Sequence, residues 1–352
     1  MPEDDRTMRA WRTHEYGRPT DVLRLDTVPV PTPEAGELLV RVQAIPFNLN
    51  DLERITGGNM MVRPELPYSP GMEVMGIVDA CGEGVEQWQG HRVVAMPKAA
   101  NGGFAEYAVC PAVSTFEMPD SIPLPGAAAL YFPFHLAWLG LFDRADLRAG
   151  ESVLIHAAAG GSGSAAVQLA KHAGARVFAT AGTDEKVQLC RDLGADVAIN
   201  YNDTDFAEVV LAETGNRGVD VVFDNVGEAV MEKSLQCTVY NGRYLMMGFA
   251  SNKVVADEPF IVPRRIMLAN VKLCGVLLAY QTPEAAEFLK TAMGWNVATT
   301  ELGERIMREI VELVLAGKIR PVVGQTIAFD DIPEAIEAMA NRQTTGRTIV
   351  LL

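Results

Sequence analysis

The spacing of apolar and polar positions changes twice along the chain of 352 residues. Up to about residue 130, short apolar runs stand between glycines and prolines, as in "ELLVRVQAIPFNLND", "GMEVMGIVDACGEGV", "HRVVAMP" and "GGFAEYAVCP". Such runs predict short β-strands joined by tight turns. Many short strands at this spacing indicate a compact, barrel-like domain.

From about residue 135 to 276, apolar strands alternate with helical patterns. The strand "ESVLIHAA" precedes the helix "GSAAVQLAKHAG", and the strand "ARVFATAG" precedes the helix "DEKVQLCRDLGA". Further strands are "DVAINY", "VDVVFDNVG", "GRYLMMGFA" and "VKLCGVLLA". This alternation predicts a parallel, doubly wound sheet, and the nearly continuous apolar strands suit burial on both faces.

The remaining residues, 277–352, resemble the first zone in their spacing of apolar and polar positions. A helix is expected in "ELGERIMREIVELVLAGKI", a strand in "PVVGQTIAF", a short helix in "IPEAIEAMANR" and a closing strand in "GRTIVLL". We therefore expect an α/β protein with two domains, one built from residues 1–134 and 277–352 and the other from residues 135–276. Residues 281–303 have no evident role in this scheme.

A glycine-rich turn follows the first strand of the second zone. Gly160 would let the backbone approach a pyrophosphate, and Gly163 would let the next helix pack closely on the strand. The N-terminus of that helix offers free N–H groups to phosphates. Ala158 stands at the usual tight-turn glycine, while Ser162 and Ser164 add hydroxyl groups. The turn predicts a dinucleotide site, and the alternative is a glycine-rich turn without a ligand.

The end of the second strand favours NADPH over NADH. NAD-specific folds place Asp or Glu here to hold the ribose 2′-hydroxyl, but this chain has Gly182. Lys186 is placed to pair with a 2′-phosphate, and Tyr201 to add a hydroxyl or stack beside the adenosine. Asp184 and Glu185 argue the other way, although both also suit the first turn of a helix. The alternative for Lys186 is a solvated helix lysine.

Composition excludes several classes of partner. Apolar residues make up 49% of the chain and charged residues 21%, and the net charge of −15 argues against nucleic acid. No apolar run reaches the roughly 18–20 residues of a membrane-spanning helix. The start "MPEDDRTMRAW" lacks the pattern of a signal peptide. Five scattered cysteines suit a reducing compartment, so we expect a cytoplasmic protein.

Motifs along nearly the whole chain resemble one superfamily. They include "YGRPTDVLRL", "NLNDLERITGG", "LPYSPGMEVMGIV", "RAGESVLIHAAAGGSGSAAVQLAK", "LGADVAINY", "GVDVVFDNVG", "GKIRPVVG" and "TTGRTIVLL". With these motifs the chain resembles the medium-chain dehydrogenase/reductase superfamily, in its zinc-independent NADPH:quinone oxidoreductase (ζ-crystallin-like) branch. The resemblance implies a GroES-like β-barrel catalytic domain (1–134 and 277–352) and an inserted Rossmann-fold NADPH-binding domain (135–276). It also implies homodimers formed through about residues 271–279.

The same resemblance implies a set of site residues. Asn48 would lie near the nicotinamide, which sits between the domains. The other expected cofactor contacts are Gly160, Gly161, Ser162 and Gly163 at the pyrophosphate, Gly182, Lys186 and Tyr201 at the ribose phosphate, and Met247, Gly248, Phe249, Ala250, Val276, Leu277 and Leu278 at the nicotinamide half. The expected substrate-pocket residues are Met60, Phe134, His135 and Phe249. For Phe134 and His135 the alternative is packing in the interior, and for Met60 it is a core or exposed-loop position.

The residues do not match the zinc-dependent members of the superfamily. Met72 stands where those enzymes carry a ligating histidine, and "PFNLND" offers no cysteine. The lobe of four clustered cysteines is absent, and the five histidines are dispersed. His156, at the end of a buried strand, is expected to be a packed structural residue. We therefore expect no metal, since a catalytic zinc needs three protein ligands.

Chemistry without a Lewis acid needs a substrate that is already polarised. No Tyr-x-x-x-Lys pair is present either, so the expected substrate is a quinone or the activated C=C bond of an α,β-unsaturated carbonyl. Asn48 is the expected polar catalytic group, and the alternative is a turn asparagine that holds its own backbone. No general acid is identified. Two other functions stay open: reduction of enoyl thioesters (CoA or carrier-bound), and a non-enzymatic NADPH-binding role like that of ζ-crystallins.

Overall fold

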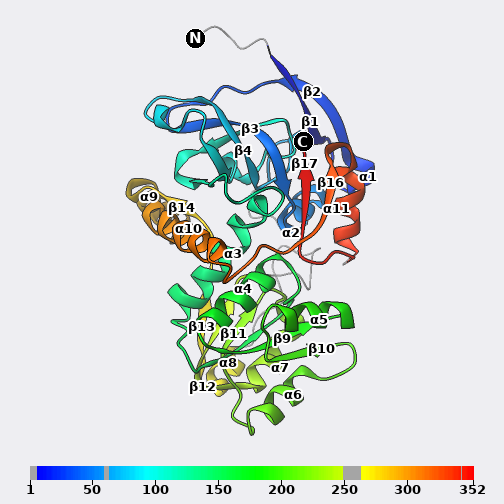
Figure 1. Ribbon diagram of the computed structural model, residues 1–352, viewed down its shortest axis with the longest axis vertical. Coiled ribbons are helices and arrows are strands. Elements are labelled where there is room, and N and C mark those ends of the chain that lie inside the picture. Colours follow the sequence, from blue (N-terminus) through cyan, green and yellow to red (C-terminus); the bar gives the residue numbers. More distant parts are fainter. Residues whose placement is uncertain (1–5, 59–62, 249–262, 342) are drawn as a thin grey trace. The chain divides into compact units, whose positions relative to one another are not determined.

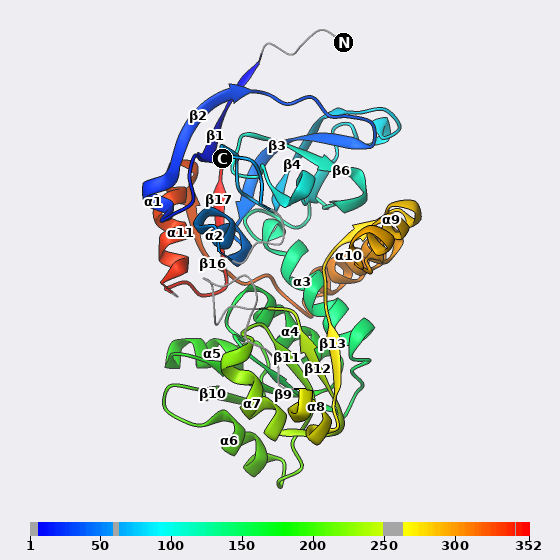
Figure 2. The ribbon, with the colours of Figure 1, turned by 180° about the vertical axis from the view of Figure 1, so that it is seen from behind.

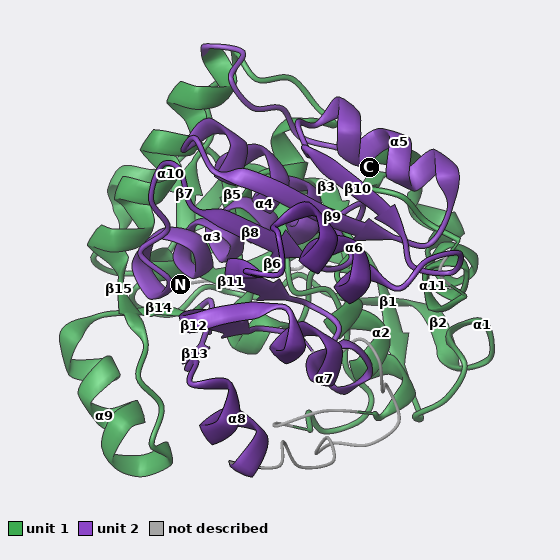
Figure 3. Cartoon of the chain, turned by 90° about the horizontal axis from the view of Figure 1, so that it is seen from below, with its two compact units in different colours: residues 1–131, 279–315, 323–352 green, residues 132–278, 316–322 purple. Residues whose placement is uncertain are grey.

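The computed structural model describes residues 6–58, 63–248, 263–341 and 343–352. The chain forms two compact units, which Figure 3 shows in two colours. The barrel unit comprises residues 1–131, 279–315 and 323–352, and the sheet unit comprises residues 132–278 and 316–322. Among the described helices, none is both long and apolar enough to span a membrane.

The barrel unit is organised around β3 (Glu37–Pro46), which pairs with three other strands (Figure 1). Its sheet has the order β16-β17-β3-β4-β5-β7, and β6 also pairs with β3. The other strands are β4 (Val74–Cys81), β5 (Arg92–Ala95), β6 (Tyr107–Pro111), β7 (Thr115–Glu117), β16 (Val323–Ala328) and β17 (Arg347–Leu351). An antiparallel hairpin joins β1 (Thr7–Thr13) to β2 (Leu23–Pro29). The closing strand β17 thus pairs with β3 of the first zone, as its sequence pattern indicated.

Helices complete the barrel unit. They are α1 (Pro19–Val22), α2 (Leu49–Thr56), α9 (Pro283–Met293), α10 (Thr300–Leu315) and α11 (Ile332–Ala340), and α3 (Tyr131–Trp138) begins at the unit border. In Figure 2, α1, α2 and α11 lie side by side. The stretch 281–303 forms α9 and part of a small parallel pair, β14 (Tyr280–Gln281) with β15 (Ala298–Thr299). Single helical turns are η1 (Glu86–Trp88), η2 (Lys98–Ala100), η3 (Ala112–Ser114), η4 (Ala127–Ala129) and η6 (Phe329–Asp331).

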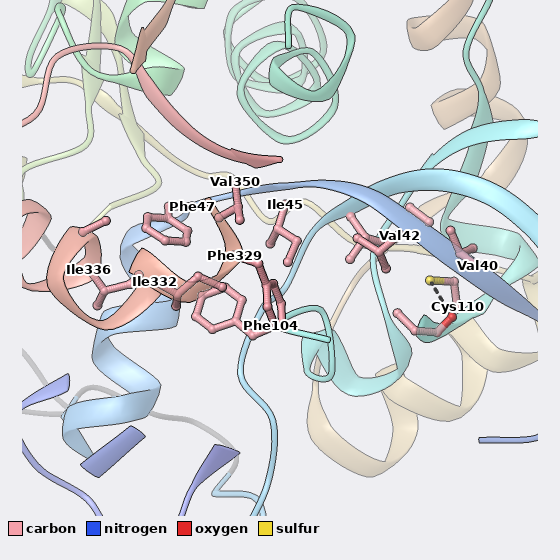
Figure 4. Close-up of a cluster of buried hydrophobic side chains, with 14 of the residues drawn as sticks. Val40, Val42, Ile45, Phe47, Phe104, Cys110, Phe329, Ile332, Ile336 and Val350 are labelled. Carbon is pink, nitrogen blue, oxygen red and sulfur yellow. Dashed lines mark hydrogen bonds between the residues drawn. The ribbon is translucent and has the colours of Figure 1, made fainter. Parts of the chain in front are cut away.

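The core of the barrel unit is built by both ends of the chain (Figure 4). Phe47 and Phe104 come from the first zone, and their ring centroids are 5.5 Å apart. Phe329, Ile332 and Val350 come from the tail and pack in the same cluster. Burying a side chain of this size contributes roughly 1.5–3 kcal/mol, so neither end completes the core alone.

In the described part of the sheet unit, six parallel strands have the order β10-β9-β8-β11-β12-β13. They are β8 (Ser152–Ile155), β9 (Arg176–Ala181), β10 (Val197–Asn200), β11 (Val219–Asp224), β12 (Thr238–Met246) and β13 (Lys272–Gly275). Its helices are α4 (Gly161–His172), α5 (Asp184–Asp192), α6 (Phe206–Glu213), α7 (Glu228–Gln236) and α8 (Pro263–Ala269), with a π-helix η5 (Leu139–Arg144). The predicted doubly wound α/β fold is confirmed. The strand order reverses between β8 and β11, where such folds bind ligands.

The unit borders differ in detail from the expected domain borders. Residues 316–322 belong to the sheet unit although they lie within the expected tail segment. A reciprocal pair of hydrogen bonds attaches them: Gln168 donates from Nε2 to the Arg320 carbonyl at 3.0 Å, and the Arg320 N–H donates to Gln168 Oε1 at 2.8 Å. The side-chain amide of Gln168 on α4 therefore satisfies both backbone groups of Arg320 and attaches residues 316–322 to the sheet unit.

Candidate functional site

The glycine-rich turn has two glycines with different physical roles. A Cβ at Gly163 would stand 2.2 Å from the Ala157 carbonyl oxygen and 2.7 Å from the Cα of Ala158, so helix α4 approaches the end of β8 too closely for any side chain. A Cβ at Gly160 would meet only the Ala157 oxygen, at 3.3 Å. The protein's own packing thus requires glycine at 163, whereas Gly160 leaves space beside the backbone that a ligand can use.

The first turn of α4 is suited to an anion. Helix N-termini present N–H groups without intrahelical partners, and the helix dipole favours negative charge there. This turn, which includes Gly161, Ser162 and Gly163, carries no acidic residue. Ser164, the second hydroxyl singled out in the sequence, already donates to the Gly161 carbonyl at 2.9 Å. Ser162 is therefore the hydroxyl of the turn that a phosphate could use.

Gly182 lies directly against Tyr201. A Cβ at Gly182 would be 2.5 Å from the Tyr201 hydroxyl oxygen and 2.9 Å from its Cζ. The Tyr201 N–H donates to the Ala181 carbonyl at 3.1 Å, and Asn202 Nδ2 donates to the Gly182 carbonyl at 2.7 Å. These bonds join the ends of β9 and β10, so a carboxylate at position 182 is excluded unless Tyr201 moves.

Lys186 lies in the first turn of α5, beside two acids that have partners of their own. Thr183 caps this helix by accepting from the Lys186 N–H at 3.3 Å. Asp184 accepts from Asn200 Nδ2 at 3.0 Å. Hydrogen bonds from backbone N–H and from Thr183 lower the pKa of Glu185. Asp184 thus links α5 to the end of β10, and Glu185 accepts hydrogen bonds at the start of the helix.

The residues expected at the nicotinamide half follow β12 and β13. The Met247 N–H donates to the Asp224 carbonyl at 3.4 Å, and the Val276 N–H donates to the Met246 carbonyl at 3.0 Å. A Cβ at Gly248 would lie 2.5 Å from the Asn225 carbonyl oxygen. Leu277 is partly exposed and Leu278 is buried. Phe249 and Ala250 lie outside the described residues.

The topology gathers the predicted cofactor residues of the sheet unit at one edge. Gly160 and Gly163 follow β8, Gly182 follows β9, and Tyr201 follows β10. Met247 to Gly248 follow β12, and Val276 to Leu278 follow β13. All of these strands are parallel, so their carboxyl ends share one edge of the sheet. This is the edge at which doubly wound folds bind dinucleotides.

Asn48 belongs to the barrel unit and is buried in a polar cluster. It is the N-cap of α2, and its side-chain Nδ2 donates to Glu73 Oε2 at 3.1 Å. Arg347 donates from Nη1 to Asn48 Oδ1 at 3.1 Å and also pairs with Glu73. Glu73 and Arg347 are only 1% and 5% exposed. Their side chains supply the hydrogen-bond partners that the buried side-chain amide of Asn48 needs in place of water.

Asp51 completes the cluster from the first turn of α2. Its Oδ2 accepts from the Asn48 N–H at 2.8 Å, and its Oδ1 accepts from the Met72 N–H at 2.9 Å. Burial raises the pKa of Asp51 to about 6, although these donors and the guanidinium of Arg347 favour its charged form. Sequence analysis missed Asp51, Glu73 and Arg347. The signal was present, because Glu73 and Arg347 are charged residues flanking strongly apolar runs.

Other expected site residues have less to connect them. Phe134 and His135 are both buried in α3, and burial lowers the pKa of His135 to about 3, so this imidazole is neutral. That environment agrees with the alternative of interior packing. Met60, like Phe249, lies outside the described residues.

Potential metal ligands are dispersed over the described part of the chain. Nowhere in it do three or more His, Cys, Asp or Glu side chains gather in a way that could hold a metal ion. Met72, the residue at the expected histidine position, has a buried side chain. The cysteines are free thiols, three of them buried and two partly buried.

Comparisons with known proteins agree with this architecture. Residues 34–120 match the family model "Alcohol dehydrogenase GroES-like domain", and residues 161–294 match "Zinc-binding dehydrogenase". The human quinone oxidoreductase is 30% identical over 355 residues, and the match covers 100% of both proteins. This chain belongs to the quinone oxidoreductase family of the medium-chain dehydrogenase/reductase superfamily. The predicted membership and the GroES-like fold of the barrel unit are thereby confirmed.

Solved structures give the same result. The quinone oxidoreductase of Escherichia coli, determined in complex with NADPH, superposes with a TM-score of 0.83 at 27% identity over 99% of this chain and 100% of that chain. A mycobacterial protein complexed with NADPH has a TM-score of 0.83 at 32% identity over 98% and 100% of the two chains. A highly reducing polyketide synthase of Arthrinium phaeospermum is 31% identical over 333 residues, 92% of this chain but 13% of the synthase.

Proposed function

We propose that this protein is an NADPH-dependent oxidoreductase that reduces quinones or the activated C=C bond of α,β-unsaturated carbonyls without a metal. The observation that carries the proposal is the pair of glycine positions at the sheet edge: the turn at Gly160 to Gly163, and Gly182 beneath Tyr201. Two structural neighbours were solved with NADPH, which supports the choice of cofactor. When bound, this cofactor supplies a hydride.

In this proposal the sheet unit holds the cofactor. The N–H groups of the first turn of α4 and the Ser162 hydroxyl take the pyrophosphate, and this turn itself carries no acidic residue. Lys186 and the Tyr201 hydroxyl take the 2′-phosphate. The amide and carbonyl groups that follow β12 and β13 border the nicotinamide half. The barrel unit is the proposed catalytic domain.

Asn48 is the proposed donor toward the substrate oxygen or the nicotinamide ribose. A primary amide has two N–H bonds. One of them donates to Glu73 at 3.1 Å, and among the described residues the other reaches only the Pro46 carbonyl, at the long distance of 3.5 Å. The second N–H is therefore the one that can exchange its weak bond for a stronger one. Donation to an oxygen that gains negative charge as hydride arrives stabilises that charge, and solvent water protonates the product.

The absence of a metal is proposed from the donor set. Met72 has a thioether where zinc-dependent members of the superfamily carry histidine, and its neighbour Glu73 is already bound to Arg347 and Asn48. A thioether is a poor ligand for zinc compared with imidazole or thiolate. Quinones and enones are polarised already, so a few oriented N–H donors suffice for them.

A panel of substrates with NADPH and NADH side by side tests the function. We expect oxidation of NADPH with 9,10-phenanthrenequinone or small enones, monitored at the nicotinamide absorbance. A preference for crotonyl-CoA would instead favour the enoyl-thioester alternative, to which the polyketide synthase relative lends some support. Tight NADPH binding without turnover of any substrate would favour the non-enzymatic alternative.

Lys186→Ala tests the phosphate contact. A hydrogen bond between charged groups is worth about 1.5–3 kcal/mol, so the ratio of kcat/KM for NADPH to that for NADH should fall by roughly 10- to 150-fold. Lys290→Ala, which removes an exposed lysine on α9 in the other unit, is the matched control and should leave the ratio unchanged. If the wild-type protein uses NADH as well as NADPH and Lys186→Ala does not alter the ratio, the cofactor assignment is wrong.

The proposal extends to assembly and location. β13 is bonded to β12 on one side only among the described strands, and Leu273 on it is 41% exposed. An open strand edge with an apolar side chain favours pairing with a second chain, so we propose a homodimer joined at β13. The free cysteines support a cytoplasmic location.

A further inference from the structure

A chain of buried hydrogen bonds lies beside the dinucleotide turn in the sheet unit. His156 follows β8 directly and is 1% exposed. Its Nδ1 is 3.0 Å from the Thr180 hydroxyl on β9, and its Nε2 is 2.8 Å from the Ser234 hydroxyl on α7. Thr180 and Ser234 are buried as well. One imidazole therefore connects three elements of the unit.

Ser234 extends this network further. Its hydroxyl donates to the Val230 carbonyl at 2.8 Å and is also hydrogen-bonded to Tyr244 on β12. Burial lowers the pKa of His156 to about 3, and the Phe206 ring packs edge-on at 4.8 Å. The imidazole is therefore neutral, and each of its ring nitrogens has a buried hydroxyl partner.

The turn depends on the same residues. The Ala158 N–H donates to the Thr180 carbonyl at 3.0 Å, so Thr180 holds both residues that flank Ala157. Ala157 itself has a φ of 51°, in the left-handed region that a residue with a Cβ rarely adopts. The carbonyl of Ala157 in turn accepts from the Gly160 N–H at 3.0 Å. An unusual backbone conformation under the turn is therefore clamped from both sides.

We propose that His156, together with Thr180 and Ser234, is a positioning element that fixes the backbone of the dinucleotide turn and so sets the affinity for the cofactor. None of the three side chains is assigned a contact with the cofactor. The inference rests on the proposed function, because it takes the turn to be where the cofactor pyrophosphate binds. Loss of the hydrogen bonds between His156 and Thr180 or Ser234 lets the turn leave the conformation that the pyrophosphate needs, and the chemical step is unaffected.

Thr180→Val is the principal test, since it removes the hydroxyl and keeps the shape. We expect the Kd for NADPH, measured by its fluorescence, to rise about tenfold, while kcat at saturating NADPH changes by less than twofold. Thr180→Ser keeps the hydroxyl and should restore the Kd to within about twofold of the wild-type value. The matched control is Thr115→Val in the barrel unit, a buried threonine whose hydroxyl donates to the Pro111 carbonyl at 2.9 Å. It should leave the Kd unchanged.

Ser234→Ala repeats the test at the other end of the hydrogen-bond network and replaces Thr180→Val as the test if that variant does not fold. It removes the hydroxyl partner of His156 Nε2 and should also raise the Kd. A normal Kd in a folded Thr180→Val or Ser234→Ala protein, with thermal stability lowered as in Thr115→Val, would overturn the inference and leave the proposed function intact. Failure of the wild-type protein to bind NADPH at all would overturn both.

Discussion

The two glycines of the turn make a quantitative prediction about packing and binding. In Gly163→Ala the new Cβ would stand 2.2 Å from the Ala157 oxygen, whereas ordinary contact begins at 3.4 Å. The helix and the strand end would have to separate by the difference, and both obstacles are backbone atoms. Overpacking of this kind costs about 1–3 kcal/mol, and we take the upper end because backbone yields less than side chains.

The net effect is smaller because alanine is the better helix former. Alanine gains about 1 kcal/mol over glycine inside a helix, which leaves a loss of about 2 kcal/mol for Gly163→Ala. For a unit of this size that corresponds to a fall in Tm of roughly 4–8 °C. Gly160→Ala has a φ of −80° and one contact at 3.3 Å, so its stability should change by no more than about 0.5 kcal/mol.

Thermal unfolding of the free protein and NADPH titration together form the assay. We expect Gly163→Ala to lower both Tm and affinity. We expect Gly160→Ala to keep its Tm and to bind NADPH at least about tenfold more weakly, because its methyl group occupies the space left for the pyrophosphate. Undiminished affinity in Gly160→Ala would refute the pyrophosphate assignment, and an unchanged Tm in Gly163→Ala would refute the close-packing argument.

Two further predictions concern the barrel unit and the open strand. The pKa of Asp51 is raised to about 6 in the folded protein, so protonation of this carboxyl stabilises the fold at low pH, and that contribution is lost as pH rises from about 4 through 6. Over that range, the difference in unfolding free energy between Asp51→Asn and wild type should change by up to about 3 kcal/mol. A difference that does not depend on pH in urea unfolding would contradict this. If the proposed dimer forms at β13, Leu273→Lys should yield a monomer in light scattering, whereas Leu315→Lys, at an exposed position on α10, should not. A wild-type monomer would contradict the proposed interface.

Local patterns in the sequence were sufficient to predict the strands and helices of the sheet unit. Each strand is a short apolar run, the dinucleotide turn is continuous in sequence, and "GSAAVQLAKHAG" and "DEKVQLCRDLGA" became α4 and α5. The ends of strands were harder to place. The stretch 271–279 was expected to be a strand throughout, but β13 ends at Gly275. The run "ELLVRVQAIPFNLND" was likewise expected to be strand-like, but β3 ends at Pro46 and Asn48 caps a helix, held by Asp51.

The polar cluster around Asn48 was beyond the reach of local patterns. Its partners Glu73 and Arg347 lie 25 and 299 positions away in sequence, and only the folded barrel brings them together. The same holds for the contact between Tyr201 and Gly182, which the sequence suggested as a shared role but not as a steric fit. Single residues of the right type were visible, whereas their mutual distances needed the fold.

The position of β17 between β16 and β3 has a consequence for how the protein is made. All strands of the parallel sheet are encoded before residue 276, so this sheet can assemble while synthesis of the tail continues. The barrel cannot close, because its central strand awaits a neighbour encoded by residues 347–351. On the edge of β3 that β17 joins, β6 already pairs with Glu37 to Arg41, so only Ala44 to Pro46 lack their partner until the tail is made, and we expect the barrel to close only after synthesis is complete.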